Sequence, residues 1–254
     1  MFFSVLTGPP GRLARYAVFD SSEEGLATHY DIVRCAEVAS TQNVANDRFT
    51  NTGVTTLVVA DRQVAGRGRQ GRTWLEPDRG MFASLVFHTS WADADLTLIP
   101  LTAAVAVAEA IGAESSSRVD LKWPNDLLVD GKKIGGILVE ASGTRVTVGC
   151  GVNLSWSEPP EFAAAVFASD PGSTAAERLA LGWVDRLQEV MAGPAGDWPR
   201  GSYVDRCITL GSDVSWVGGA GRATDIGTDG SLIVETVSGV VEVRHGDVHL
   251  SGSG

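Results

Sequence analysis

The sequence predicts an α+β fold, in which a mixed β-sheet domain flanked by helices is followed by a small β-barrel. Three observations lead to this prediction. Segments typical of strands and of helices are mixed between residues 30 and 205. From residue 206 to residue 254, short β-rich runs separated by glycine turns take over. With 254 residues, of which 44% are hydrophobic, the chain has room for one large domain and a small appendage.

The first half of the chain is interpreted from composition and periodicity. Residues 1–29 show no clear period and predict a partly disordered N-terminal extension. Residues 55–60 and 81–88 are apolar and typical of strands, whereas residues 61–79 between them are rich in Gly and Arg and predict a loop. Residues 99–113 are apolar and predict a buried helix.

Strands are predicted again in the middle of the chain. Residues 119–129 predict a strand pair around Pro124-Asn125-Asp126, and Asp130-Gly131 supplies a turn. Residues 134–140 and 145–152 predict two more strands.

A helix and the small barrel complete the prediction. Thr174 and Glu177 have the spacing of a capping box and open a helix that runs to about Met191. Prolines and glycines in residues 194–201 then break the pattern. The predicted strands of the barrel are residues 213–217, 222–226, 231–236 and 240–244.

Charge and hydropathy argue against two classes of partner. The formal net charge of -11 repels a phosphate backbone, so we expect no DNA binding. The apolar N-terminal run meets Pro9-Pro10 at once and does not predict a secretory signal. Residues 96–111 contain Pro100 and Glu109 and are too short and polar for a membrane span, so we expect no membrane partner.

Cysteine and histidine positions argue against a metal site. Cys35, Cys150 and Cys207 are odd in number and far apart, so neither a disulfide framework nor a zinc site is indicated. Isolated thiols are typical of a reducing cytoplasm, which is the predicted location. His245 and His249 are four residues apart in a strand-like region and are interpreted as surface residues. No metal held by protein ligands is predicted.

The most informative stretch is the loop from Gln63 to Arg72. Its G-x-G-x-x-G spacing does not predict a dinucleotide site, because five residues separate the strand from Gly66 and no helix start follows Gly71. Glycine allows close backbone approach, and Arg offers a planar charged fork to phosphate or carboxylate. The loop therefore favours an anionic ligand, without which it should repel itself and be mobile. A solvated surface loop is the alternative.

Two further motifs have structural alternatives when taken singly. Residues 122–126, Lys-Trp-Pro-Asn-Asp, are also compatible with a simple turn. Lys133, at the start of residues 133–140, is also compatible with a solvated strand end. These two motifs occur together with the loop, with Ser40-Thr41 and with the Gly-Cys-Gly-Val-Asn run of residues 149–153. The whole set indicates a functional site more strongly than any one motif does.

This ordered set resembles the biotin–protein ligase family over roughly residues 30–250. The family's GRGRxGR loop is present at residues 66–72, its KWPND motif at 122–126 and its K-[LIV]-[AG]-G-I-L-[VI]-E segment at 133–140. The resemblance implies a catalytic domain at residues 30–205 and an SH3-like β-barrel at residues 206–254. One departure is Gln42, where the family usually has Asn.

The resemblance implies a two-step reaction with ATP and biotin as substrates and with Mg²⁺. Biotin is activated to biotinyl-5'-AMP and then transferred to a specific lysine of a biotin carboxyl carrier domain, such as that of acetyl-CoA carboxylase. About 30 residues precede the match, fewer than a DNA-binding domain needs, so we expect a monofunctional ligase without repressor function. We expect a monomer or a weak homodimer.

The resemblance also assigns the residues of the site. Lys133 and Arg67 are the predicted catalytic residues. The predicted biotin-binding residues are Ser40, Thr41, Gln42, Gln63, Gly66, Arg67, Gly68, Arg69 and Lys133. The predicted residues for ATP and the adenylate are Arg67, Arg69, Arg72, Trp74, Lys122, Asn125 and Asn153.

Alternatives stay open at this point. Trp74 either stacks on adenine or packs in the core, and Asp126 is also compatible with a structural role. The nearest rival function is a lipoate or octanoate ligase, which shares the catalytic fold in the resemblance. A non-catalytic binding protein or transcriptional regulator is the rival from another class.

Overall fold

The computed structural model describes residues 13–17 and 29–250. An eight-stranded mixed sheet forms its centre, in the order β1-β2-β3-β4-β8-β7-β6-β5. Only β2 and β3 are parallel, and the other neighbours are antiparallel. The strands are β1 (Leu13–Ala17), β2 (His29–Val38), β3 (Thr56–Gln63), β4 (Arg79–His88), β5 (Asp120–Lys122), β6 (Asp126–Val129), β7 (Lys132–Ser142) and β8 (Arg145–Ser155).

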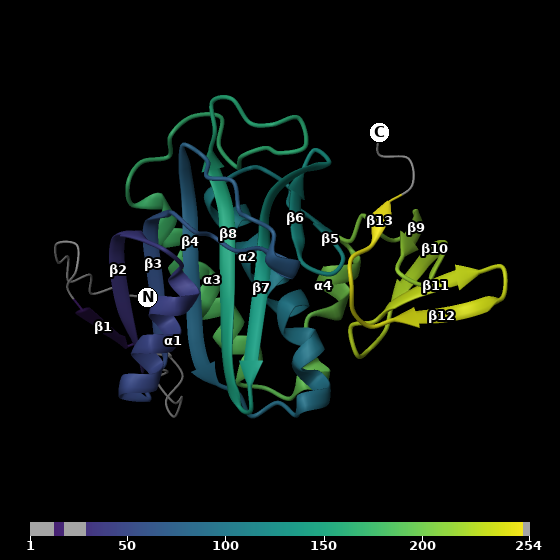
Figure 1. Cartoon of the computed structure of the whole chain (residues 1–254), viewed down its shortest axis with the longest axis horizontal. Helices are drawn as coiled ribbons and strands as arrows, with labels where there is room; N and C mark the ends of the chain where they lie inside the picture. Colours follow the sequence, from purple (N-terminus) through teal and green to yellow (C-terminus); the bar gives the residue numbers. More distant parts are fainter. Residues whose placement is uncertain (1–12, 18–28, 251–254) are drawn as a thin grey trace.

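Helices cover the two faces of this sheet unequally (Figure 1). α2 (Ile99–Glu114) and α3 (Ala175–Met191) pack on one face, and their apolar residues form the main core with Leu57, Val59 and Leu85. α1 (Thr41–Thr52) packs on the other face, where Phe49 meets Val58 and Val86. Because side chains alternate along a strand, neighbouring residues of β3 and β4 point to opposite faces of the sheet. The smaller cover on the α1 side leaves space for a cavity.

The apolar helix α2 is part of the core. The segment Asp93–Glu114, which includes the short helix η2 (Asp93–Leu98), is long and apolar enough to cross a membrane, yet 67% of its most apolar window is buried inside the protein. Pro100 lies in its first turn, where its missing N–H leaves no intrahelical bond unmade. The prediction of a buried helix with a proline near its start is confirmed.

The C-terminal residues form a five-stranded antiparallel sheet in the order β12-β11-β10-β9-β13, beyond the β5 edge of the large sheet (Figure 1). The small β domain is thereby confirmed. Two short helices, η3 (Ala195–Asp197) and α4 (Arg200–Val204), lead into it. Its strands are β9 (Asp213–Trp216), β10 (Gly219–Ile226), β11 (Leu232–Thr236), β12 (Gly239–Val243) and β13 (His249–Leu250).

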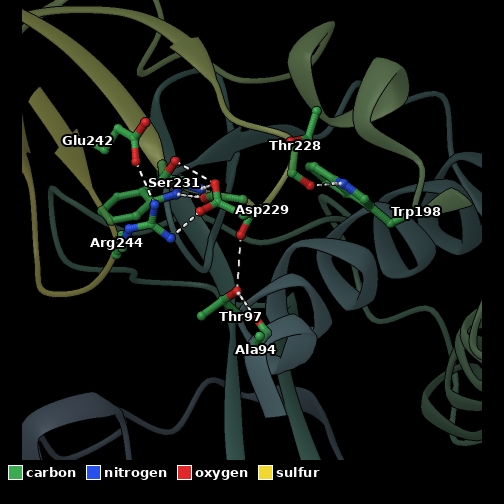
Figure 2. A network of polar contacts seen from close by, with 10 residues as sticks. Ala94, Thr97, Trp198, Thr228, Asp229, Ser231, Glu242 and Arg244 are labelled. Carbon is green, nitrogen blue, oxygen red and sulfur yellow. Dashed lines mark hydrogen bonds and ion pairs between the residues drawn. The ribbon is translucent and has the colours of Figure 1, made fainter. Parts of the chain in front are cut away.

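A turn between β10 and β11 fixes this sheet to the large domain (Figure 2). The hydroxyl of Thr97 donates a hydrogen bond to the backbone carbonyl of Asp229 at 3.0 Å. The indole of Trp198 donates to the carbonyl of Thr228 at 3.0 Å, while Arg244 bonds to the Asp229 carboxylate. These contacts hold the C-terminal sheet in one orientation, so the segment after β12 can reach the large domain.

Several details differ from the sequence predictions. The capping-box prediction is wrong, because the Thr174 hydroxyl makes no cap hydrogen bond. That hydroxyl accepts a hydrogen bond from Arg178 at 2.7 Å, and Glu177 pairs with Arg34 of β2. The strand β1 lies within the extension that was predicted to be partly disordered, and residues 1–12 and 18–28 of that extension lie outside the described residues. Strand β2 and helices α1 and α4 were not predicted.

Candidate active site

A cavity of about 350 Å³ lies at the N-terminal end of α1. Strands β4, β7 and β8 contribute its floor, and residues 66–74, here called the arginine–glycine loop, contribute one wall. This volume suits a small-molecule ligand. Of the predicted site residues, those that line it are Ser40, Thr41, Gln42, Gln63, Arg67, Gly68, Arg69, Arg72, Trp74, Asn125, Lys133 and Asn153.

One end of the cavity is neutral and polar, and we call it the neutral end. Thr41 donates to the side-chain oxygen of Gln63 from its backbone nitrogen at 2.8 Å and from its hydroxyl at 3.0 Å. The Thr41 hydroxyl also shares a 2.8 Å hydrogen bond with the hydroxyl of Ser84. Ser40, Thr41 and Ser84 are buried. This end therefore offers fixed hydroxyl and amide groups without a net charge.

The arginine–glycine loop is a tight hairpin rather than an open loop. The backbone of Trp74 donates to Gly66 at 3.0 Å, and the backbone of Gly68 donates to Arg72 at 2.7 Å. Gln70 and Gly71 turn the chain with positive φ angles of 57° and 73°. No helix follows directly, in agreement with the rejection of a dinucleotide-binding loop. The hairpin places its Arg side chains along one edge of the cavity.

The arginines on the N-terminal side of the loop have acidic partners. Arg62 is hydrogen-bonded to Glu76 at 2.8 Å, which lowers the pKa of that carboxyl group below its usual value. Arg67 donates to the side-chain oxygen of Asn43 at 2.8 Å and lies 3.8 Å from the Glu140 carboxylate of β7. The expectation that the loop repels itself is therefore wrong, because other parts of the chain neutralise its charge.

Arg69 and Arg72 contact the C-terminal domain. Arg69 donates to the side-chain oxygen of Asn125 at 3.0 Å and to the backbone carbonyl of Gly246 at 3.2 Å. Its guanidinium also lies 3.6 Å from the carboxylate of Asp247, and Arg72 forms an ion pair with the same carboxylate. Gly246 and Asp247 lie between β12 and β13, so two domains meet at this wall of the cavity.

Lys133 lies at the start of β7 and reaches into the cavity. Its ammonium group donates to the Asp126 carboxylate at 2.5 Å and lies 5.9 Å from the centre of the Trp74 ring. Lys132 is exposed and does not line the cavity. We call this end, with Lys133, Asp126, Arg69 and Arg72, the charged end.

Two buried polar atoms at the cavity have no hydrogen-bond partner among the described residues. One is the side-chain oxygen of Asn153, whose amide nitrogen donates to Ala164 at 2.9 Å. The other is the indole nitrogen of Trp74, whose ring lies over Gly151 so closely that a β-carbon there would be 3.3 Å from it. A buried group without a partner is costly, so both atoms are suited to a ligand or to ordered water.

Two predicted residues do not line the cavity. Gly66 lies behind the wall, where its carbonyl accepts the backbone N–H of Trp74. Lys122, in the short strand β5, also lies outside the lining. The lining residue Cys150 is not a candidate nucleophile, because burial raises the pKa of its thiol far above the usual value.

Several lining residues were not among the predicted site residues, and Ser84, Trp156 and Phe162 are three of them. Ser84 is the one polar side chain in the apolar run 80–87 of β4, and that isolation was the available signal. Trp156 and Phe162 follow β8 in an irregular segment without periodicity, so nothing in the sequence marked them. Asp126, for which a structural role was left open, lines the cavity as the partner of Lys133.

Comparison with known proteins relates this site to a family. The model of the biotin/lipoate A/B protein ligase family matches residues 35–153, which contain all the motifs singled out above. Residues 35–153 of the chain are therefore similar to this family. The chain is 29% identical over 211 residues to the biotin–[acetyl-CoA-carboxylase] ligase of Mycobacterium tuberculosis, an alignment that covers 76% of this chain and 77% of the relative.

Other relatives agree over shorter stretches. A bifunctional ligase/repressor of Bacillus spizizenii is 35% identical over 154 residues, which are 58% of this chain and 47% of the relative. This chain therefore spans about half the length of that relative. The biotin protein ligase of Aquifex aeolicus, solved with biotin and ATP, superimposes with a TM-score of 0.73 at 27% identity, covering 86% of this chain and 97% of that one.

The structure explains how Gln42 fits at a position where the family usually has Asn. Its amide nitrogen donates to the carbonyl of Leu138 at 3.4 Å, and its side chain packs against Gly149 of β8. A β-carbon on Gly149 would lie only 3.1 Å from the Gln42 side chain. The longer amide is thus accommodated because the strand beneath it has glycine.

Proposed function

We propose that this chain is an ATP-dependent biotin–protein ligase. It would activate biotin to biotinyl-5'-AMP and transfer the biotin to a lysine of a biotin carboxyl carrier domain, such as that of acetyl-CoA carboxylase. The observation that carries the proposal is one cavity in which a neutral polar end adjoins an end lined by Lys133, Arg69 and Arg72. Biotin has the matching shape, with a neutral ureido ring at one end and a carboxylate at the other.

The first step joins two anions, so cations rather than a nucleophile are required of the protein. An oxygen of the biotin carboxylate attacks the α-phosphorus of ATP, and the bond to pyrophosphate breaks. Lys133 would bind the carboxylate and then the α-phosphate, which means that it exchanges its ion pair with Asp126 for the ligand. Arg67, Arg69 and Arg72 would bind the phosphates.

The second step transfers the acyl group. The acceptor lysine amine attacks the carbonyl carbon of the mixed anhydride, the bond to the phosphate oxygen breaks, and AMP leaves. The proton lost by the amine is accepted by a base or by water. Trp74 and Asn153, each with an unpartnered buried polar atom, are proposed to contact the adenylate. Asn125 would act by holding Arg69, and Lys122 stays a prediction without support from the cavity lining.

Mg²⁺ would enter with ATP as the MgATP substrate. Among the residues that the structure describes, no group of three or more His, Cys, Asp or Glu is placed to hold a metal ion. Mg²⁺ prefers phosphate oxygens and few protein ligands, which fits an ion carried by the nucleotide. ATP and carboxylases are found in the cytoplasm, so the proposed substrates imply a cytoplasmic protein.

The experiment incubates the chain with MgATP, an acceptor domain and either biotin or lipoate, and measures the mass of the acceptor. We expect the biotin mass on the target lysine, no product without ATP, and little product with lipoate. The hydroxyl and amide groups of the neutral end suit a ureido ring, whereas the dithiolane ring of lipoate has no N–H or C=O to pair with them. Preferential lipoylation, or no modified acceptor, would refute the proposal.

A further inference from the structure

The segment between β12 and β13 completes the wall of the cavity from the other domain. Asp247 forms an ion pair with Arg72 and lies 3.6 Å from Arg69, and the carbonyl of Gly246 accepts from Arg69 at 3.2 Å. The side chains of Arg69 and Asp247 are only 24% and 22% exposed. This contact is therefore less open to solvent than an ordinary surface ion pair.

The contact matters because the hydrogen bonds of the arginine–glycine loop order its backbone and leave its arginine side chains mostly to other parts of the chain. The loop contains Gly66, Gly68 and Gly71, and glycines lose the most conformational freedom on ordering. Its own hydrogen bonds fix the backbone of the hairpin. Within the loop, the guanidinium of Arg72 has a 3.3 Å bond to the carbonyl of Arg69, and the other contacts of the two guanidinium groups come from outside the loop. A cation that is already oriented costs less to use when a phosphate arrives.

We propose that Asp247 is a positioning residue for Arg69 and Arg72, by which the C-terminal domain contributes to nucleotide binding without touching the reacting atoms. Arg72 uses its Nη2 on Asp247, and Arg69 uses Nη1 on Asn125 and Nη2 on Gly246. Because a guanidinium has five N–H donors, each arginine retains donors for a phosphate. Asp247 fixes the direction in which those donors point.

The opposite role, competition with phosphate for the arginines, predicts opposite results. A competing carboxylate would weaken nucleotide binding, so its removal would lower the KM for ATP. A positioning carboxylate lowers that KM, and its removal raises it. The inference rests on the proposed function only for the identity of the nucleotide, since the ordering of the loop is measurable without any reaction.

The test compares Asp247→Asn with Glu235→Gln. Both substitutions remove one negative charge from the C-terminal domain, but Glu235 is exposed on β11 and is not among the residues that line the cavity. Amide hydrogen exchange of residues 66–74 is measured first, in the ligand-free chain. We expect exchange to accelerate by about fivefold in Asp247→Asn, the effect of one partly exposed charge-assisted hydrogen bond, and to stay unchanged in Glu235→Gln.

Steady-state kinetics provide the second readout. We expect Asp247→Asn to raise the KM for ATP by about fivefold and to change kcat by less than about twofold, because ground-state and transition-state binding are lost together. Equal loop exchange in both variants, or a lower KM for ATP in Asp247→Asn, would overturn the inference. If the parent chain forms no biotinyl-AMP, the proposed function fails, yet the exchange measurement still decides the role of Asp247.

Discussion

The two ends of the cavity are held together by different kinds of interaction. At the neutral end, Thr41, Ser84 and Gln63 form short hydrogen bonds between uncharged groups, and the hydroxyl groups are buried. At the charged end, Lys133 and Arg72 are partly exposed and paired with carboxylates. A buried neutral network has one geometry, whereas an ion pair can exchange its acid for an anionic ligand. Under the proposed function, the neutral end would therefore provide recognition and the charged end would provide catalysis.

The largest effect is expected at Lys133. Replacing Lys133 with Ala should lower single-turnover formation of biotinyl-AMP by about a thousandfold, the upper range for the loss of one charge-stabilising donor. Lys133→Arg keeps the charge but changes the donor geometry, so it should rescue only in part.

Lys132 is the matched control for this prediction. It is the neighbouring lysine of the same strand, and it is exposed and absent from the cavity lining. Lys132→Ala should change stability by less than about 0.5 kcal/mol and leave the rate unchanged. A damaging Lys132→Ala with a silent Lys133→Ala would contradict the assignment of the charged end.

A smaller loss is expected at Arg67, which is 46% exposed and shared with Asn43 and Glu140. Arg67→Ala should raise the activation free energy of adenylate formation by about 2 kcal/mol. The melting temperature should stay unchanged. The rate is measured under single-turnover conditions and the melt by circular dichroism. A rate within about threefold of the parent would remove Arg67 from the catalytic residues.

At the neutral end, the effect should appear in affinity instead of rate. Thr41→Val removes the hydroxyl that bonds to Gln63 and Ser84 while keeping the shape, and should raise the KM for biotin by about tenfold. The KM for ATP should stay the same. Thr50→Val, on the exposed side of the same helix, is the control. A KM change for ATP alone would mean that the two ends have been assigned the wrong way round.

The smallest effect is that of ionic strength. Raising the salt concentration from 0.05 to 0.5 M, a range of about tenfold, shortens the screening length and should raise the KM for ATP by about threefold. The KM for biotin should change less, because biotin has one carboxylate and a neutral ring, whereas ATP has several charged phosphates. Steady-state kinetics at several salt concentrations measure both values, and equal salt dependence would erase the distinction between the ends.

Sequence patterns predicted the parts of this molecule whose residues are regular or close together in the chain. The helix α2 and the strands β3, β4, β7 and β8 were predicted because long apolar runs mark them. Helix α1 was not, because its sequence TQNVANDRFTNT is mostly polar and buries only one side against the sheet. Its packing is decided by tertiary contacts, which local patterns do not report.

The same limit applies to the site. The motifs predicted much of the polar lining of the cavity, since Arg67, Asn125 and Lys133 each lie in a recognisable run. Their partners could not be predicted, because they come from distant parts of the chain. Arg72 and Asp247 are 175 residues apart in the sequence. Arg67 follows β3 and Glu140 lies in β7, so their contact depends on how the sheet is assembled. The balance of charge in the cavity is therefore a property of the fold.

Hydrogen exchange with separate ligands tests the division of the cavity most directly. The chain is measured free, with biotin alone and with a non-hydrolysable MgATP analogue alone. We predict that biotin slows exchange at the start of α1, around residues 40–45, and that the nucleotide slows exchange in the arginine–glycine loop, residues 66–74. The division into two ends is supported if the nucleotide protects the loop and leaves α1 exchange unchanged, and if biotin protects α1 and leaves loop exchange unchanged. Protection of α1 by the nucleotide alone, or identical footprints for the two ligands, would contradict it.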